Sequence, residues 1–173
     1  LAQTMGTAVM RLADADVLPL QFTGFADNLL QYQKEIEAEH KAQAGAPAFD
    51  FQPLEQAVAA LHSAAQDYDQ AFAAASANRS LFQIAPADRD ALNALLYTSE
   101  RKLLDPAGLP RRPWYQHQIY APGFYTGYGV KTMPGVREAI EQKDYAEAAR
   151  EEQVLVKVLD AFTAQIQAAK AKL

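Results

Sequence analysis

The segment from residue 105 to residue 133 constrains the fold most, because it can form neither a long helix nor a central strand. Proline removes a backbone donor and glycine weakens regular structure, and both recur throughout it. They are Pro106, Gly108, Pro110, Pro113, Pro122, Gly123, Gly127 and Gly129. The segment also holds six of the 17 aromatic residues, too many for a disordered linker. Irregular connections of this length are commonly binding or active-site loops, so we expect function to reside here.

The rest of the chain shows helical periodicity, with apolar residues recurring every three or four positions. This pattern predicts helices over about 1–14, 22–44, 50–75 and 88–104, and from about residue 144 to near the end. Asp50 and Asp144 are the predicted N-caps of two of them. The predicted buried faces are Leu1, Met5, Ala8 and Leu12; Phe22, Phe25, Leu29, Tyr32 and Ile36; Leu54, Val58, Leu61, Ala65, Tyr68 and Phe72; Leu92, Leu95, Leu96, Ser99 and Leu103; and Leu155, Leu159, Phe162, Ile166 and Ala169.

The last four of these helices are long and amphipathic, and no convincing alternating strand is present, so the sequence predicts an all-α fold. We expect one antiparallel, four-helix-bundle-like domain over residues 1–173, with the loop 105–133 inserted before the C-terminal helices. A chain of 173 residues, half of them hydrophobic, is long enough to bury a core. Because it begins at Leu1 in a helical pattern, we expect it to be part of a longer protein.

Charge and composition exclude several classes of function. The net charge is −5 with a pI of about 5.2, and the basic residues form no stripe, which argues against nucleic-acid binding. We expect no membrane segment, because apolar runs stay far short of the roughly 20 residues that cross a bilayer. The absence of cysteine excludes disulfides and thiol catalysis.

Residues that could perform chemistry are few and scattered. His40, His62 and His117 lie far apart and show no metal-ligand spacing, so we expect no metal site and no cofactor within this chain. We expect His40 to be solvated, His62 to adjoin the Leu61 face, and His117 to form hydrogen bonds within the loop. Carboxylate pairs are predicted to lie on solvated helix faces: Glu35/Glu37, Asp67/Asp69, Asp88/Asp90 and Glu151/Glu152. No residue is predicted to be catalytic.

Three stretches are similar to a known family. LDPAGLPRRPWYQHQIYAP resembles the D-P-x-G-L-P, R-P-[FWY]-[YF]-x-H and x-I-Y-A-P series of the transferrin receptor-like dimerisation domain. LAQTMGTAVMRLADADVLPLQF resembles that family's first helix, and YGVKTMPGVREAI resembles its Y-x-G-x-x-F-P-G-I segment. These matches span nearly the whole chain in the family's order, while the long middle helices match by pattern alone.

The resemblance implies a dimerisation domain at the C-terminal end of an M28-type glutamate carboxypeptidase, which is a zinc-dependent exopeptidase. Its implied partners are a second copy, its own protease domain and the peptide substrate of the parent. The catalytic domain and its zinc are expected outside this chain, so this chain alone is expected not to be an enzyme. The resemblance alone implies an extracytoplasmic location.

The resemblance also supplies candidate site residues. In the carboxypeptidases a lysine–tyrosine pair of this loop reaches the pocket for the substrate's acidic C-terminal side chain. The tyrosine corresponds to Tyr128, but the lysine position is occupied by Gly127, which weakens the expectation of a C-terminal glutamate. A tyrosine hydroxyl suits a carboxylate, and a packing role for Tyr128 is equally open. The residues expected to anchor the loop on neighbouring domains are Trp114, Tyr115, His117, Tyr120 and Pro122.

Two other functions remain open on sequence grounds. The parent could be a transferrin receptor-like protein without activity, in which this domain serves assembly and partner binding. The longer Gly- and Tyr-containing loop favours the peptidase branch over that one. A freestanding helical adaptor that binds a peptide through its aromatic loop is the third possibility.

Overall fold

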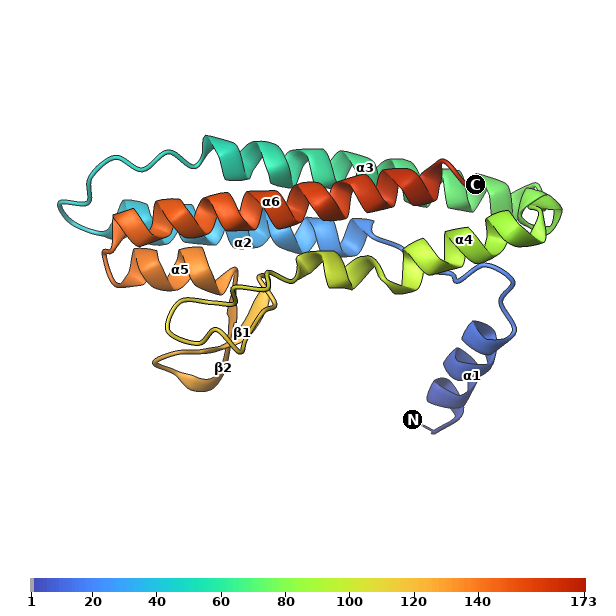
Figure 1. Cartoon of the computed structure of the whole chain (residues 1–173), viewed down its shortest axis with the longest axis horizontal. Coiled ribbons are helices and arrows are strands. Elements are labelled where there is room, and N and C mark those ends of the chain that lie inside the picture. The colour runs from blue at the N-terminus through green and yellow to red at the C-terminus, as the bar shows by residue number, and fades with distance from the viewer. Residues whose placement is uncertain (1) are drawn as a thin grey trace.

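The computed structural model describes residues 2–173 as a helical domain with one small two-stranded sheet (Figure 1). The helical class expected from the sequence is confirmed. The α-helices are α1 Ala2–Ala13, α2 Thr23–Ala42, α3 Gln52–Ala77, α4 Pro86–Tyr97, α5 Pro134–Glu141 and α6 Tyr145–Lys170. Two 3-10 turns, η1 Ser80–Gln83 and η2 Ser99–Leu103, and two strands, β1 Tyr120–Gly123 and β2 Gly127–Thr132, complete it.

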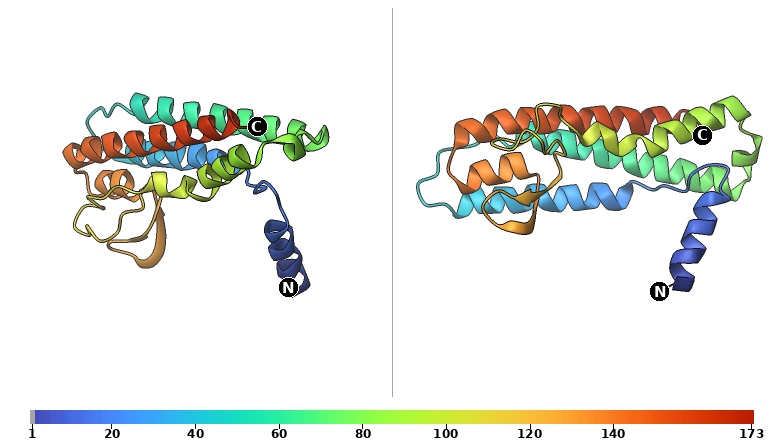
Figure 2. Two further views of the ribbon diagram at one scale, coloured as in Figure 1. Left: turned by 45° about the vertical axis from the view of Figure 1, so that its right-hand side comes forward. Right: turned by 60° about the horizontal axis from the view of Figure 1, so that its bottom comes forward.

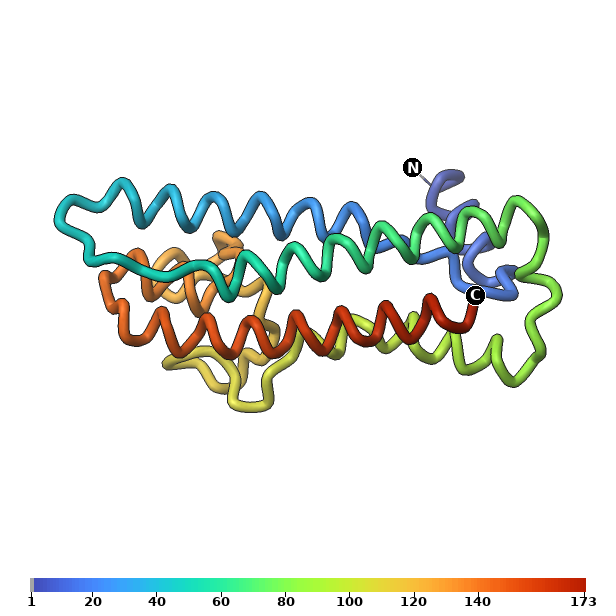
Figure 3. Tube along the Cα trace, turned by 90° about the horizontal axis from the view of Figure 1, so that it is seen from above, coloured from blue at the N-terminus to red at the C-terminus, as the bar shows by residue number. Residues whose placement is uncertain are grey.

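The long helices α2, α3 and α6 lie along one another, and α5 and the α4–η2 segment pack against α6 (Figures 1 and 3). As expected, α2 and α3 run antiparallel. In addition, α3 and α6, which are not consecutive in the chain, lie side by side and run in the same direction. The α4–η2 segment and α5 run in the opposite direction and bring the chain back to the end at which α3 begins, so α6 starts there (Figure 1).

The core forms where the faces of α2, α3 and α6 meet. Leu54, Val58, Leu61, Ala65 and Tyr68 of α3 have no exposed side-chain surface, as their spacing predicted. The predicted face of α6 is buried as well. Edge-on aromatic contacts join the helices: Phe22 lies 5.2 Å from Tyr68 and 5.8 Å from Phe162, between ring centroids.

The helix expected over 88–104 is divided into α4 and η2. Thr98 donates its hydroxyl to the carbonyl of Ala94 at 2.6 Å, and Gln165 of α6 donates to the carbonyl of Leu95 at 2.7 Å. Gln165 therefore uses a carbonyl that a continuing helix would offer to its own backbone, while the carbonyl of Ala94 still accepts from the N–H of Thr98. The division brings Ser99, predicted on the buried face, to a buried position.

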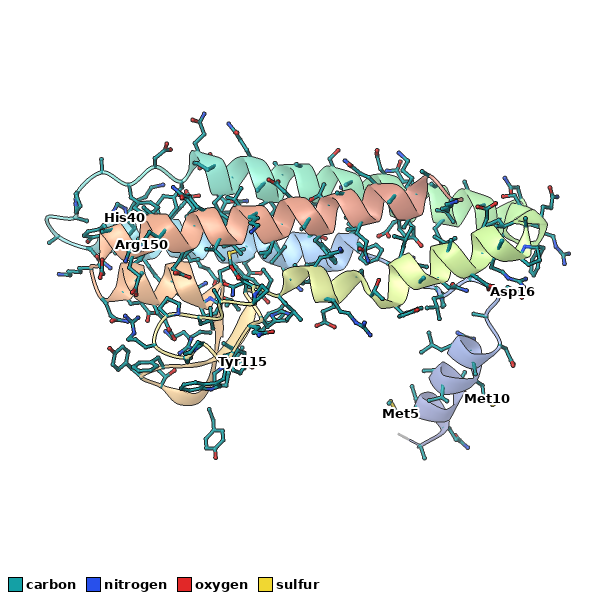
Figure 4. The ribbon with its side chains drawn as sticks, in the orientation of Figure 1. Met5, Met10, Asp16, His40, Tyr115 and Arg150 are labelled. Carbon is teal, nitrogen blue, oxygen red and sulfur yellow. The ribbon has the colours of Figure 1, made fainter. Side chains whose placement is uncertain are left out.

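Helix α1 stands away from the helical body (Figures 1 and 2) and buries none of its described residues. Met5 and Met10 are more than 60% exposed and lie far from the other helices (Figure 4). The predicted end near Asp14 is confirmed, but the predicted burial of Met5, Ala8 and Leu12 is wrong for this chain by itself. Leu1, the first residue of that face, lies outside the described residues.

His40 corrects one prediction, because it is buried and not solvated. Its Nε2 lies 3.0 Å from the carbonyl oxygen of Pro47, and its ring packs against Phe51 and Tyr145 at 5.6 Å. His62 is paired with Asp27 at 2.9 Å near the surface. The loop between α2 and α3 thus closes over His40 and covers that end of the core.

The carboxylate pairs are mostly at the surface, but Glu152 is an exception with only 6% exposure. Burial raises the pKa of its carboxyl to about 7, although the N–H of Leu54 hydrogen-bonds to it and opposes the shift. Asp69 is half-buried and accepts from the N–H groups of Phe22 and Thr23 at the start of α2. The expectation of a solvated face is wrong for these two residues.

The raised pKa of Glu152 predicts stability that falls as pH rises. The folded domain retains the Glu152 proton up to about pH 7, whereas an unfolded glutamate loses it near pH 4.3. The resulting loss of folding stability is absent below pH 4.3 and complete above pH 7, where it amounts to roughly 1–3 kcal/mol. We expect Glu152→Gln to flatten this dependence in urea unfolding between pH 5 and 8. Glu55→Gln, at an exposed position of α3, is the matched control. Equal slopes in wild type and Glu152→Gln would contradict the assignment.

Candidate functional site

The connector, residues 104–133, is an ordered structure that projects from one side of the helical body (Figure 1). Its first part folds back through hydrogen bonds from Asp105 N to Gln116 O and from Leu109 N to Tyr115 O, both 2.9 Å. Gly108 is required at the turn: its φ is +71°, and an added Cβ would lie 2.2 Å from the carbonyl oxygen of Pro113.

The second part of the connector is a β-hairpin, whereas the sequence showed no convincing alternating strand. Strands β1 and β2 pair antiparallel, with Tyr120 opposite Thr132 and Pro122 opposite Val130. Both strands of a two-stranded ribbon are edge strands, where proline is tolerated. The prolines and glycines of this segment, which argued against a central strand, are therefore compatible with a two-stranded hairpin.

Arg112 and Glu138 form a buried ion pair that joins the connector to α5. Nη2 of Arg112 lies 2.9 Å from Oε2 of Glu138, and both side chains are 6% exposed. The other carboxylate oxygen accepts from the N–H of Phe124 at 2.8 Å. Within residues 2–173, the guanidinium N–H groups of Arg112 make no well-aligned hydrogen bond. Its charge is compensated by its ion pair with Glu138.

Arg111 joins the connector to α6. It donates two hydrogen bonds to Glu147, at 2.8 and 3.1 Å, and these raise the pKa of the guanidinium further. Asp144 accepts from the N–H of Glu147 and caps α6, as predicted. The side chain of Glu147 is engaged by Arg111. The ring of Phe124 lies 5.5 Å from one guanidinium and 5.8 Å from the other.

Arg137, next to Glu138, attaches α5 to α2. It pairs with Glu35 at 2.9 Å and Glu39 at 2.7 Å, and it donates to the carbonyl and the hydroxyl of Thr132 in β2. The arginines and glutamates of these pairs were not predicted to have this role. Their partners lie 26 to 102 residues away, so no local spacing reveals them.

His117 and Tyr120 occupy the base of the hairpin. Nδ1 of His117 accepts from the N–H groups of Ile119 and Tyr120, at 3.2 and 3.1 Å, and the two rings stack at 5.8 Å. Burial lowers the pKa of the imidazole, while Glu100 nearby opposes that shift. The ring is therefore neutral at pH 7, and Nδ1 acts as an acceptor.

The other candidate residues lie on the exposed part of the connector. Tyr128 is fully exposed, and Trp114 is 77% exposed. Gly127 has a φ of +62°, and the space beside it is open. With Tyr115 (Figure 4), Pro122 and Phe124, these residues line a shallow hollow of about 330 Å³. The structure thus brings Trp114, Tyr115, Pro122, Gly127 and Tyr128 together on one surface, whereas His117 and Tyr120 lie apart from it.

Residues 49–167 match the family described as the transferrin receptor-like dimerisation domain. This match covers more than half of the chain. The chain belongs to that family. It is 33% identical over 141 residues to the probable glutamate carboxypeptidase LAMP1 of Arabidopsis thaliana, and 28% identical over 141 residues to a probable glutamate carboxypeptidase of Arthroderma benhamiae. Each alignment covers 82% of this chain and 19% of the relative.

A third relative matches nearly the whole chain. Aminopeptidase NAALADL1 of Rattus norvegicus is 25% identical over 179 residues, which cover 96% of this chain and 22% of the relative. The dimerisation domain therefore spans about a fifth of the length of the curated relatives it matches. Its connector lies wholly inside the matched region.

Residues 2–173 contain neither a group of side chains that could hold a metal ion nor a helix that could span a membrane. Among residues 2–173, no three His, Cys, Asp or Glu side chains lie together in a way that could hold a metal ion. Within the same range, every helix is too short or too polar to cross a bilayer. Lys131, in strand β2 of the hairpin, is paired with Glu141.

We expect Glu138→Gln to destabilise the domain by roughly 3–5 kcal/mol, because it leaves the charge of Arg112 buried and uncompensated. The amide oxygen can still accept from Phe124, so the loss reports mainly on the ion pair. Urea unfolding measures it. Glu141→Gln is the matched control three residues further along α5: its pair with Lys131 is more exposed, so the expected loss is below about 1 kcal/mol. Equal losses would show that the Arg112–Glu138 pair has no special weight.

Trp114 is the only tryptophan and therefore reports on the connector. Since it is 77% exposed, we expect acrylamide to quench the emission of the 173-residue chain almost as efficiently as that of N-acetyltryptophanamide. The measurement is repeated on dilution, because self-association through the apolar surface would shield the indole. Strong protection that persists on dilution would place Trp114 inside the domain.

Proposed function

We propose that this chain is the C-terminal assembly domain of a zinc-dependent peptidase of the glutamate carboxypeptidase type. In this proposal its bundle-like helical body, α2 to α6, mediates a two-fold homodimer, and its connector completes the substrate pocket of the protease domain. The single observation that carries the pocket assignment is the fully exposed Tyr128 beside Trp114, on a connector that the ion pairs of Arg111 and Arg112 hold in place. Large exposed aromatic side chains are usually covered by a partner or a ligand.

Family membership and the relatives' names support the rest of the proposal. The relatives are named as carboxypeptidases and an aminopeptidase, and all are far longer than this chain. Zinc and the catalytic residues would then be held by the part of the parent outside residues 1–173. This chain contributes binding surface only: the Tyr128 hydroxyl can donate one hydrogen bond to a peptide oxygen.

The exposed helix α1 also fits a larger parent. Met5, Val9, Met10 and Leu12 are 45–66% exposed, and a helix of this length is marginal in water without a packing partner. We propose that the protease domain covers this face, which gives α1 the burial that the periodicity of its sequence predicts.

The test uses the full-length gene product. We expect it to bind zinc, to form dimers in light scattering and to hydrolyse peptides, and we expect removal of residues 1–173 to abolish dimers and hydrolysis. The double variant Trp114→Ala/Tyr128→Ala changes exposed positions only, so it is expected to retain zinc and the dimer and to lose at least tenfold in kcat/KM.

Three results would contradict parts of the proposal. A zinc-free, inactive dimer would instead indicate a receptor-like assembly protein. A gene product that begins near Leu1 would indicate a freestanding adaptor. Full activity in the double variant would separate the connector from the substrate pocket.

A further inference from the structure

The exposed part of the connector carries no charged side chain. Residues 113–130 contain neither Asp, Glu, Lys nor Arg, although such residues make up 21% of the chain. The histidine of this stretch, His117, lies at the foot of the hairpin, and burial lowers the pKa of its imidazole. All of these residues are described by the structure, so the exposed surface is neutral at pH 7.

The charges that flank this segment are all paired. Arg111 lies 2.8 Å from Glu147, Arg112 lies 2.9 Å from Glu138, and Lys131 contacts Glu141. An ion pair presents little net charge to a third group placed outside it. A ligand at the hollow therefore meets no free cation or anion from residues 111–131.

Arg112 lines the hollow, but it cannot receive a carboxylate in this arrangement. Its guanidinium nitrogens are enclosed, and Glu138 already supplies the counter-charge. The ring of Phe124 lies 5.8 Å from the guanidinium. A ligand carboxylate would have to displace both the buried Glu138 and this ring to reach it.

The surface that remains is apolar and aromatic. Tyr125 and Val130 are each 69% exposed, in addition to Trp114 and Tyr128. Aromatic faces of this kind gain by burial against apolar groups, and the tyrosine hydroxyls offer only neutral hydrogen bonds. A carboxylate placed here would lose hydration without gaining an ionic partner.

We infer that the peptide residue bound at this hollow carries a neutral aromatic or branched aliphatic side chain, and that the connector discriminates against acidic residues. This inference rests on the proposed function, since it requires that the connector meets the substrate. It departs from what the names of the carboxypeptidase relatives say of those proteins.

Gly129 is the position at which to introduce a charge. It is adjacent to Tyr128, and an added Cβ would come no closer than 3.4 Å to Thr126, an ordinary contact. Gly127 is unsuitable, because its φ of +62° strains any side chain. Gly129→Lys therefore adds a cation with little strain, and Gly129→Gln is a neutral control of similar length.

The experiment uses the full-length parent and dipeptides in which each position is varied in turn among Glu, Gln, Leu and Phe. At one position we expect kcat/KM for Leu and Phe to exceed that for Glu by about tenfold or more. Gly129→Lys is expected to raise the value for Glu about tenfold relative to Leu, and Gly129→Gln to leave the ratio unchanged. Calorimetric binding of the same peptides to chelator-treated parent gives the preference without turnover.

The outcomes separate the two claims. Preferred binding of Glu, or an apolar preference that Gly129→Lys leaves unchanged, would overturn the inference. Apolar preference in binding without hydrolysis by the zinc-loaded parent would support the inference and contradict the peptidase function. Binding of no peptide would overturn both.

Discussion

The arrangement of the whole connector depends on two adjacent side chains of opposite charge in the eight-residue helix α5. Arg137 extends to Glu35 and Glu39 of α2, whereas Glu138 extends to Arg112 and the backbone of Phe124. One short helix thereby fixes the connector relative to the helical body. Buried ion pairs stabilise little relative to apolar contacts of the same shape, but they cost much when broken, so they favour one arrangement over others.

The helical body follows from sequence periodicity, because each long helix buries one face and the apolar positions on that face are spaced accordingly. Leu54 to Tyr68 in α3 and Leu155 to Ala169 in α6 were predicted for this reason and are buried. The division of α4 from η2 was not predictable in this way. It depends on Gln165, which is distant in sequence and uses a carbonyl of Leu95.

The composition of the sequence indicated the candidate site, but it did not indicate the ion pairs that hold the connector in place. Proline, glycine and aromatic residues marked the connector, and the family motifs drew attention to Tyr128 and Trp114. The ion pairs of Arg111, Arg112 and Arg137 join segments that meet only after folding, so no spacing in the chain encodes them. Burial also changes chemistry that sequence treats as ordinary: Glu152 follows Glu151 in a polar stretch, yet its carboxyl is enclosed.

The division between the supports of the connector and its exposed surface has an evolutionary consequence. Arg111, Arg112 and their partners hold the connector in place, while Trp114 and Tyr128 contribute little to the core of this domain. Substitutions on the exposed surface can therefore accumulate with little loss of folding stability. A single helical scaffold could in this way be adapted among related proteins to ligands of different chemistry, with recognition evolving separately from the fold.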